Sequence, residues 1–153
     1  MKPWTIYGII QRITEKFNKT KEEIKSISPI FKKSLHIFPI DVANDNRLNL
    51  EIAALQTPQY NIHRFGIFFC DSPRHADLLL VLGKCSIKMI EPLKETVNQM
   101  PQPFGILVIE DENDIGIPVK DLNLGNVLGY YEKSLTANEL LNVLLNIMEA
   151  END

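Results

Sequence analysis

Short apolar runs alternate with amphipathic stretches along residues 34–153. The runs predict strands, and the most apolar of them predict strands that are buried on both faces, as in a parallel sheet. They cover residues 34–40, 65–70, 76–83, 105–109 and 127–131. Helical spacing of apolar residues follows three of these runs, at residues 48–55, 87–100 and 136–147. Thr136 and Glu139 have the spacing of a capping box at the start of the last helix. This alternation predicts an α/β fold with an open, mostly parallel sheet and flanking helices.

The first 33 residues follow a different pattern. Their apolar side chains recur at the spacing of an amphipathic helix, at Ile6, Ile9, Ile10, Ile13 and Phe17. Thr20 and Glu23 have the spacing of a capping box, which predicts a second short helix. We therefore predict an N-terminal helical extension over residues 1–33 and one core domain over residues 34–153.

Charge is distributed unevenly between these two parts. Residues 1–33 carry eight Lys/Arg and three Asp/Glu, a net charge of +5, whereas the remainder has a net charge of −9. This uneven charge favours contact of the basic part with an anionic surface or an acidic partner. The alternative is that both charged parts only face solvent, which would give the same numbers of charged residues. Nucleic acid is not an expected partner, because the basic residues lack interleaved aromatics and the acidic body would repel phosphate.

Hydropathy and cysteine usage give further limits. No apolar run approaches the ~18 residues of a membrane span, and the first residues lack the pattern of a secretory signal. A cytoplasmic protein without a transmembrane span of its own is therefore expected. Cys70 and Cys85 form no CxxC motif and, with His63 and His75, match no standard zinc spacing, so two free thiols are expected.

In an open α/β sheet, ligands bind beyond the carboxyl ends of the strands. The segments expected at those ends are residues 41–48, 70–75, 84–86 and 110–114. Asp45 and Arg47 lie in the first of them and Glu112 in the last, so these three residues are candidates to converge. Their carboxylates would bind a hard cation or pair with the arginine, and a solvated acidic turn is the simpler alternative.

Four segments resemble a known family. They are "SLHIFPIDV", "LEIAALQTPQYNIHRFGI", "DSPRHADLLLVLG" and "MPQPFGILVI". They resemble the small, cluster-bearing subunit shared by respiratory complex I (the B-type subunit of NADH:quinone oxidoreductase) and energy-converting membrane-bound [NiFe] hydrogenases. The resemblance implies a flavodoxin-like sheet and a role in electron transport. It also implies one [4Fe–4S] cluster beside the quinone or nickel–iron centre of a large subunit.

The chain departs from the family at the cluster ligands. The family holds its cluster with two cysteines after the first strand, one after the "GILVI"-like strand and one in a Pro-Gly-Cys-Pro-Pro loop. Here the first two positions match Asp45 and Leu48, the third falls at Glu112, and the last motif is absent. Because cluster iron takes thiolates, we expect a degenerate iron–sulfur site that binds no cluster and no other cofactor.

The expected function is that of a cluster-less, non-catalytic paralogue of the small subunit. It would be a structural or coupling subunit of a membrane-associated oxidoreductase complex at the inner face of the cell membrane, with a large subunit and membrane-arm subunits as partners. The resemblance implies partner-interface residues at Arg64, Phe65, Arg74 and His75, and a proton-path residue at Glu51. Fold maintenance is the simpler role for the first four, and a surface helix carboxylate for the fifth.

Two other functions stay open on the sequence. One is a redox subunit of a working NADH:quinone oxidoreductase-like or hydrogenase-like complex that uses a neighbour's cofactor. The other is a free-standing flavodoxin-like binding or regulatory domain.

Overall fold

The computed structural model describes residues 17, 18, 20 and 33–149. The predicted N-terminal amphipathic helix lies outside the described residues except for Phe17. Glu23 of the predicted capping box also lies outside them. The division of the chain at residue 33 therefore stays a prediction.

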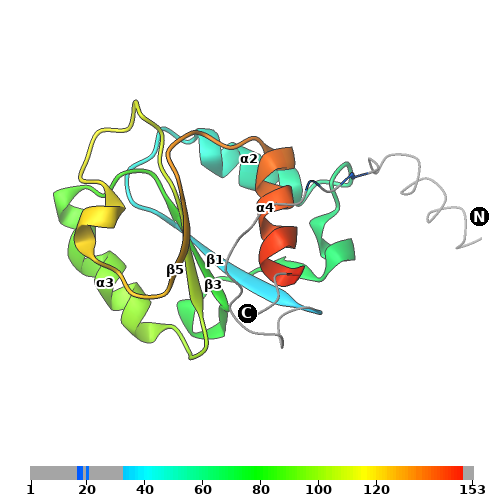
Figure 1. Ribbon diagram of the computed structural model, residues 1–153, viewed down its shortest axis with the longest axis horizontal. Helices are drawn as coiled ribbons and strands as arrows, with labels where there is room; N and C mark the ends of the chain where they lie inside the picture. The colour runs from blue at the N-terminus through cyan, green and yellow to red at the C-terminus, as the bar shows by residue number, and fades with distance from the viewer. Residues whose placement is uncertain (1–16, 19, 21–32, 150–153) are drawn as a thin grey trace, which may run out of the picture.

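Five parallel strands form one sheet in the order β2-β1-β3-β4-β5 (Figure 1). The strands are β1 (Leu35–Asp41), β2 (Ile67–Phe69), β3 (Leu78–Leu82), β4 (Gly105–Ile109) and β5 (Val127–Tyr131). Every residue of β3 and β4 is buried, as their nearly continuous apolar sequence requires of central strands covered on both faces. The predicted open, flavodoxin-like α/β architecture is confirmed.

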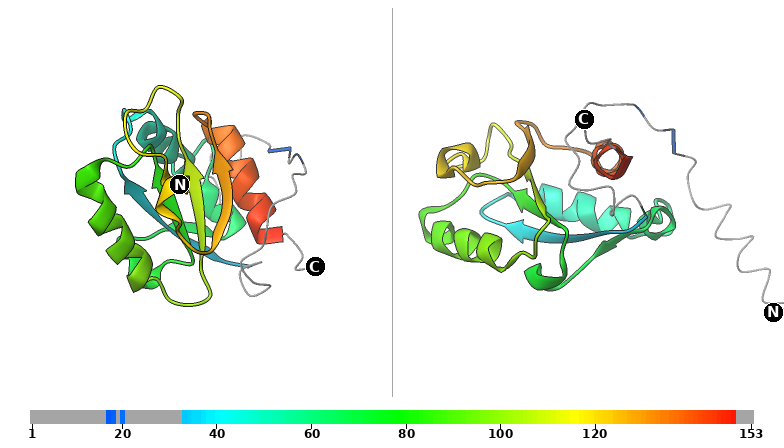
Figure 2. Two further views of the ribbon diagram at one scale, coloured as in Figure 1. Left: turned by 60° about the vertical axis from the view of Figure 1, so that its left-hand side comes forward. Right: turned by 60° about the horizontal axis from the view of Figure 1, so that its bottom comes forward.

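Helices cover both faces of the sheet. On one face α2 and α4 contact each other, whereas α3 packs on the opposite face (Figures 1 and 2). The helices are α2 (Arg47–Leu55), α3 (Ile90–Gln99) and α4 (Ala137–Glu149). The four described 3-10 turns are η2 (Ile62–Phe65), η3 (Pro73–His75), η4 (Ile87–Met89) and η5 (Val119–Leu122).

The N-terminus of α4 has the capping box that its sequence predicts. The Thr136 N–H donates to Oε2 of Glu139 (2.9 Å), and the Glu139 N–H donates to Oγ1 of Thr136 (3.4 Å). Two backbone donors that lack partners within the helix are thereby satisfied.

The stretch predicted as one strand over residues 65–70 is divided. Phe65 ends the turn η2, and β2 begins only at Ile67. Gly66 between them has a φ of 78°, and a Cβ there would lie 2.3 Å from the Lys33 carbonyl oxygen. This conformation and close approach require glycine, and they explain why the strand begins only at Ile67.

Candidate functional site

The carboxyl ends of β1, β3, β4 and β5 meet at one edge of the sheet, which we call the carboxyl edge. The residues that follow β1, β3 and β4 each donate a backbone hydrogen bond to the last residue of the neighbouring strand, which is β3, β4 and β5 in turn. These bonds run from Val42 to Leu82 (3.1 Å), from Gly83 to Ile109 (2.8 Å) and from Glu110 to Tyr131 (2.8 Å). The loops that follow the strands therefore start at one level, where ligands bind in open α/β folds.

The segment after β2 does not reach this edge, so its prediction as part of the site was wrong. β2 pairs only with Leu35–Ile37, the amino half of β1. The Cys70 N–H donates to Ile37 O and the Asp77 N–H to His36 O. Residues 70–75 therefore stay beside the beginning of β1, because a three-residue strand is too short to carry the chain across the sheet.

The loop after β1 is held by its own polar side chains. Oδ1 of Asp41 accepts from the N–H groups of Ala43 (3.1 Å) and Asn44 (3.0 Å), and its Oδ2 accepts from Nδ2 of Asn49 (2.9 Å). A Cβ on Gly83 would lie 2.9 Å from the Asn44 nitrogen, so the loop packs directly on the end of β3. The short polar residues thus fold the loop back onto the sheet.

Arg47 connects this loop to the loop after β4. Its Nη2 lies 2.7 Å from Oδ2 of Asp45 and 3.4 Å from Oδ2 of Asp111, and its Nε donates to Asp45 (2.9 Å). The hydrogen bond from this guanidinium lowers the pKa of the Asp45 carboxyl below its ordinary value. The convergence predicted for Asp45 and Arg47 is present, but the acidic partner from the second loop is Asp111 rather than Glu112.

The three residues that the resemblance matches to cluster ligands have different environments. Leu48 is 2% exposed and packs in the core between α2, α4 and the sheet. Asp45 is half-exposed in its ion pair with Arg47. Glu112 is exposed at the surface, and its backbone carbonyl accepts a hydrogen bond from Nζ of Lys84 (3.1 Å). The structure brings Asp45 and Glu112 to the same edge and places Leu48 beneath it.

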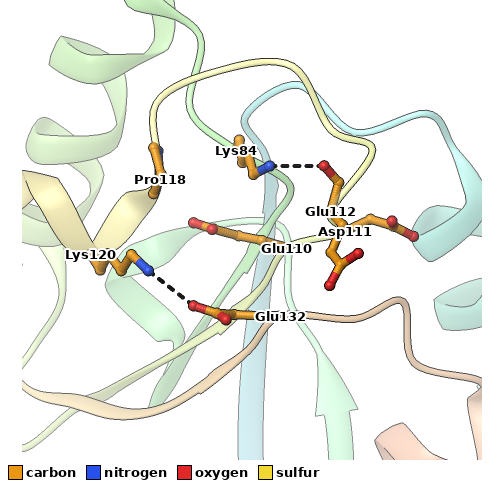
Figure 3. A pocket seen from close by; sticks show the side chains of 7 residues that line it. All are labelled: Lys84, Glu110, Asp111, Glu112, Pro118, Lys120 and Glu132. Carbon is orange, nitrogen blue, oxygen red and sulfur yellow. Dashed lines mark hydrogen bonds and ion pairs between the residues drawn. The ribbon is translucent and has the colours of Figure 1, made fainter.

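A cavity of about 220 Å³ opens beside these loops, at the ends of β3, β4 and β5. Charged side chains dominate its lining, as Figure 3 shows. The lining residues are Lys84, Glu110, Asp111, Glu112, Pro118, Lys120 and Glu132. At its rim, Nζ of Lys120 pairs with Oε1 of Glu132 (3.0 Å).

Glu110 is the buried carboxylate of this cavity, with 6% of its surface exposed. Its Oε1 accepts from the Val119 N–H (2.5 Å) at the start of η5. Burial raises the pKa of Glu110 above its ordinary value, while the Val119 hydrogen bond and the charges of Lys84 and Lys120 act in the opposite direction. Sequence reasoning missed Glu110, because nothing in "EDEND" separates its first, buried residue from the exposed ones. Its place directly after a buried strand was the available signal.

The residues at the carboxyl edge do not fit an iron–sulfur cluster. Asp45, Leu48 and Glu112, the residues that the resemblance matches to cluster ligands, offer two carboxylates and a core leucine, whereas such clusters are held by thiolates. Sγ of Cys70 donates to Ile37 O (3.4 Å), Sγ of Cys85 donates to Ser86 O (3.4 Å), and burial raises the pKa of both thiols. Within residues 17, 18, 20 and 33–149, no three His, Cys, Asp or Glu side chains group so as to hold a metal ion.

The predicted interface residues lie at the opposite, amino edge. Arg64 and Phe65 belong to η2, and Arg74 and His75 to η3, the turns that precede β2 and β3. Cζ of Arg64 lies 4.5 Å from the centre of the Phe65 ring. The structure therefore does not bring these four residues together with Asp45. Their role in binding a partner stays a prediction.

Glu51 has a structural contact that the sequence did not reveal. Its Oε2 accepts the N–H of Ala137, the first residue of α4 (2.7 Å). A carboxylate at this place satisfies a free N–H and interacts favourably with the helix dipole. Its predicted role in a proton path stays untested.

Comparison with known proteins identifies relatives of this chain. No family model matches it. The chain is 32% identical over 91 residues to a probable membrane-bound hydrogenase subunit, mbhJ, of Pyrococcus furiosus, a match that covers 60% of this chain and 54% of the relative. It is 39% identical over 69 residues to the B-type subunit of NADH-quinone oxidoreductase from Chlorobium phaeobacteroides, covering 45% and 36% of the two chains. The chain is a homologue of these subunits.

Two further matches are an uncharacterized protein and a chain of a solved structure. An uncharacterized protein of Methanocaldococcus jannaschii is 36% identical over 78 residues, covering 51% of this chain and 53% of its own length. One chain in the structure of the membrane-bound sulfane sulfur reductase, an archaeal respiratory membrane complex, shares the fold. Its TM-score is 0.55 at 22% identity, covering 80% of this chain and 76% of that one.

The matches with this homologue cover only part of each relative. The chain spans about half the length of the hydrogenase subunit and of the Methanocaldococcus protein, and about a third of the NADH-quinone oxidoreductase subunit. Among the residues described in the structure, no helix is long and apolar enough to cross a membrane.

Proposed function

We propose that the chain is a cluster-less, non-catalytic relative of the hydrogenase and complex I small subunits. In this proposal it is a structural or coupling subunit of a membrane-associated oxidoreductase complex. The observation that carries the proposal is the Arg47 side chain, which pairs with Asp45 in one loop and Asp111 in the other. By resemblance, these are two loops that supply cluster cysteines in relatives.

Packing beneath these loops supports the same proposal. A position left by a cluster ligand must be refilled, because an unfilled core cavity destabilises a protein in proportion to its volume. Leu48 is 2% exposed within the core cluster of α2 and α4. The loop above it is closed by hydrogen bonds from Asp41. The edge is thus stabilised by ordinary side chains.

The proposed partners follow from the homologues. One relative is described as a membrane-bound hydrogenase subunit and another as a subunit of NADH-quinone oxidoreductase. We infer a large subunit of the same kind and membrane-arm subunits as partners. The chain would bind them at the inner face of the cell membrane.

Purification of the tagged full chain from its native membranes tests both parts of the proposal. We expect co-purification with a hydrogenase-like or complex I-like large subunit. We also expect iron and acid-labile sulfide, assayed after the chain is separated from its partners, far below one equivalent. About four irons per separated chain, the content of one cubane cluster, would overturn the cluster-less assignment. Recovery without a large subunit would overturn the structural role.

A second candidate function is a free-standing binding domain, which the charged cavity at the carboxyl edge favours. It lies beyond strand ends, where small ligands bind in open α/β folds, and it contains the buried Glu110. This function predicts that the chain purifies as a lone monomer. It also predicts that small charged metabolites raise its melting temperature, and that Glu110→Gln reduces this shift.

A further inference from the structure

Two buried asparagines of α4 bind the backbone of one residue that lies far away in the sequence. Oδ1 of Asn142 accepts the Thr20 N–H (2.8 Å), and Nδ2 of Asn146 donates to the Thr20 carbonyl (3.0 Å). The asparagines are only 7% and 4% exposed. Their spacing of four residues places them one turn apart on the same face of the helix. Together they bind both backbone polar groups of Thr20.

A second contact lies three residues earlier. The ring of Phe17 meets the ring of Phe65 edge to face, with centroids 6.2 Å apart and an interplanar angle of 71°. Phe17 also packs against the core cluster that contains α4. An edge-to-face pair of this kind adds to the free energy gained by burial of the two rings. The segment is therefore held by an aromatic contact at one end and a backbone contact at the other.

We propose that the Asn142–Asn146 pair and Phe65 form a docking site for a peptide segment, and that its occupants are Phe17 and Thr20 of this same chain. The site binds the peptide backbone, since Thr20 itself is exposed and both bonds go to its main-chain atoms. Removal of the segment would break two hydrogen bonds to buried amides, which is unfavourable unless water or another chain replaces them.

Docking holds Phe17 and Thr20, two residues of the basic N-terminal segment, against the body of the protein. Residues 1–33 carry a net charge of +5, and the anchor lies on the sheet face that α2 and α4 cover, opposite α3. The contact also covers part of Phe65, so a partner that reaches this ring meets Phe17 as well. This inference rests on the described contacts and is independent of the proposed cluster-less function.

Amide hydrogen exchange of the full-length chain, followed by mass spectrometry over residues 14–24, tests the docking site. Thr20→Ala keeps both backbone groups, whereas Thr20→Pro removes the N–H that Asn142 accepts. Neither change alters α4. We expect Thr20→Ala to exchange like the native chain and Thr20→Pro to exchange about tenfold faster in the remaining amides of the segment. Equal rates in both variants would overturn the proposal.

Helix variants provide the complementary test. We expect Asn142→Ala and Asn146→Ala to accelerate exchange of the Thr20 amide about tenfold. Asn138→Ala, an exposed residue of the same helix, is the matched control and should leave that rate unchanged. Ultracentrifugation of the same samples distinguishes the occupants. A protected monomer supports docking within one chain, and protection found only in a dimer would assign the site to a second copy and overturn the proposal.

Discussion

The carboxylate of Glu51 in α2 accepts a hydrogen bond of 2.7 Å from the backbone N–H of Ala137, the first residue of α4. These residues are 86 positions apart, and their contact joins the two helices on one face of the sheet. It supplements the local capping box of Thr136 and Glu139. The beginning of α4 is thus stabilised by one contact from its own sequence and one from a distant helix.

This contact predicts the effect of substitutions at Glu51. Glu51→Ala should lower the free energy of unfolding by about 1 kcal/mol, the usual cost of losing a helix cap. Glu51→Gln should lower it less, because an amide oxygen still accepts the Ala137 N–H. Urea unfolding measures both effects, with Glu91→Gln on the exposed surface of α3 as the control. A stability unchanged in Glu51→Ala would contradict the structural role of this carboxylate.

We expect a larger loss of stability when Leu48 is truncated. Leu48→Ala should lower the free energy of unfolding by about 2–5 kcal/mol, because it leaves a cavity in the core between α2, α4 and the sheet. Leu50→Ala in the same helix is the matched control, since Leu50 is 70% exposed, and it should change stability by less than about 0.5 kcal/mol. Similar losses for the two variants in urea unfolding would show that Leu48 does not fill the core.

Glu110 predicts a dependence of stability on pH. Burial raises its pKa in the folded state above the ordinary value of 4.5. The folded protein therefore holds this proton more tightly than the unfolded chain does. The contribution to stability is fully present below the unfolded pKa and is lost as pH rises through the folded pKa.

Glu110→Gln removes this titration and keeps an oxygen for the Val119 N–H. Relative to this variant, the native chain should become progressively less stable as pH rises above about 4.5, the ordinary glutamate value. Urea unfolding of both proteins at a series of pH values measures the difference. If the native chain gained stability over the variant with rising pH, the pKa of Glu110 would be lowered in the folded state rather than raised. The charges of Lys84 and Lys120 would then outweigh the effect of burial on this pKa.

Arg47 predicts a change in the titration of Asp45. The hydrogen bond and charge of the guanidinium lower the pKa of the Asp45 carboxyl. Arg47→Gln should therefore raise that pKa toward the ordinary value of 3.8, as followed by the carboxyl carbon signal in NMR. Arg74→Gln at the amino edge of the sheet is the control and should leave the titration unchanged. An unaltered midpoint in Arg47→Gln would show that the two side chains do not pair in solution.

Much of the fold was predictable from local sequence. The strands over residues 105–109 and 127–131 have the predicted bounds, and the capping box of Thr136 and Glu139 forms as expected. The nearly all-apolar run over residues 76–83, which contains β3, correctly predicted a strand buried on both faces. These features depend on side-chain periodicity, capping spacing and continuous apolarity, which are properties of a few adjacent residues.

The arrangement of the site was less predictable. Sequence alone placed Asp45 and Arg47 at the carboxyl edge, and the ion pair between them is local. The prediction named Glu112 rather than Asp111 as the partner of Arg47, because a loop sequence does not reveal which of two adjacent carboxylates faces another loop. It also placed residues 70–75 at the carboxyl edge, because the sequence did not show that β2 ends beside Ile37.

By itself, the sequence determined the succession of strands and helices, the local caps and the absence of cysteine from residues 41–48 and 110–114. Only the tertiary structure decided that Arg47 joins the loops after β1 and β4, that Glu110 is buried, and that Glu51 caps α4. The physical reason is the range of the interactions. Periodicity acts between neighbours in the chain, whereas these contacts depend on strand order and on how far each loop extends beyond the sheet.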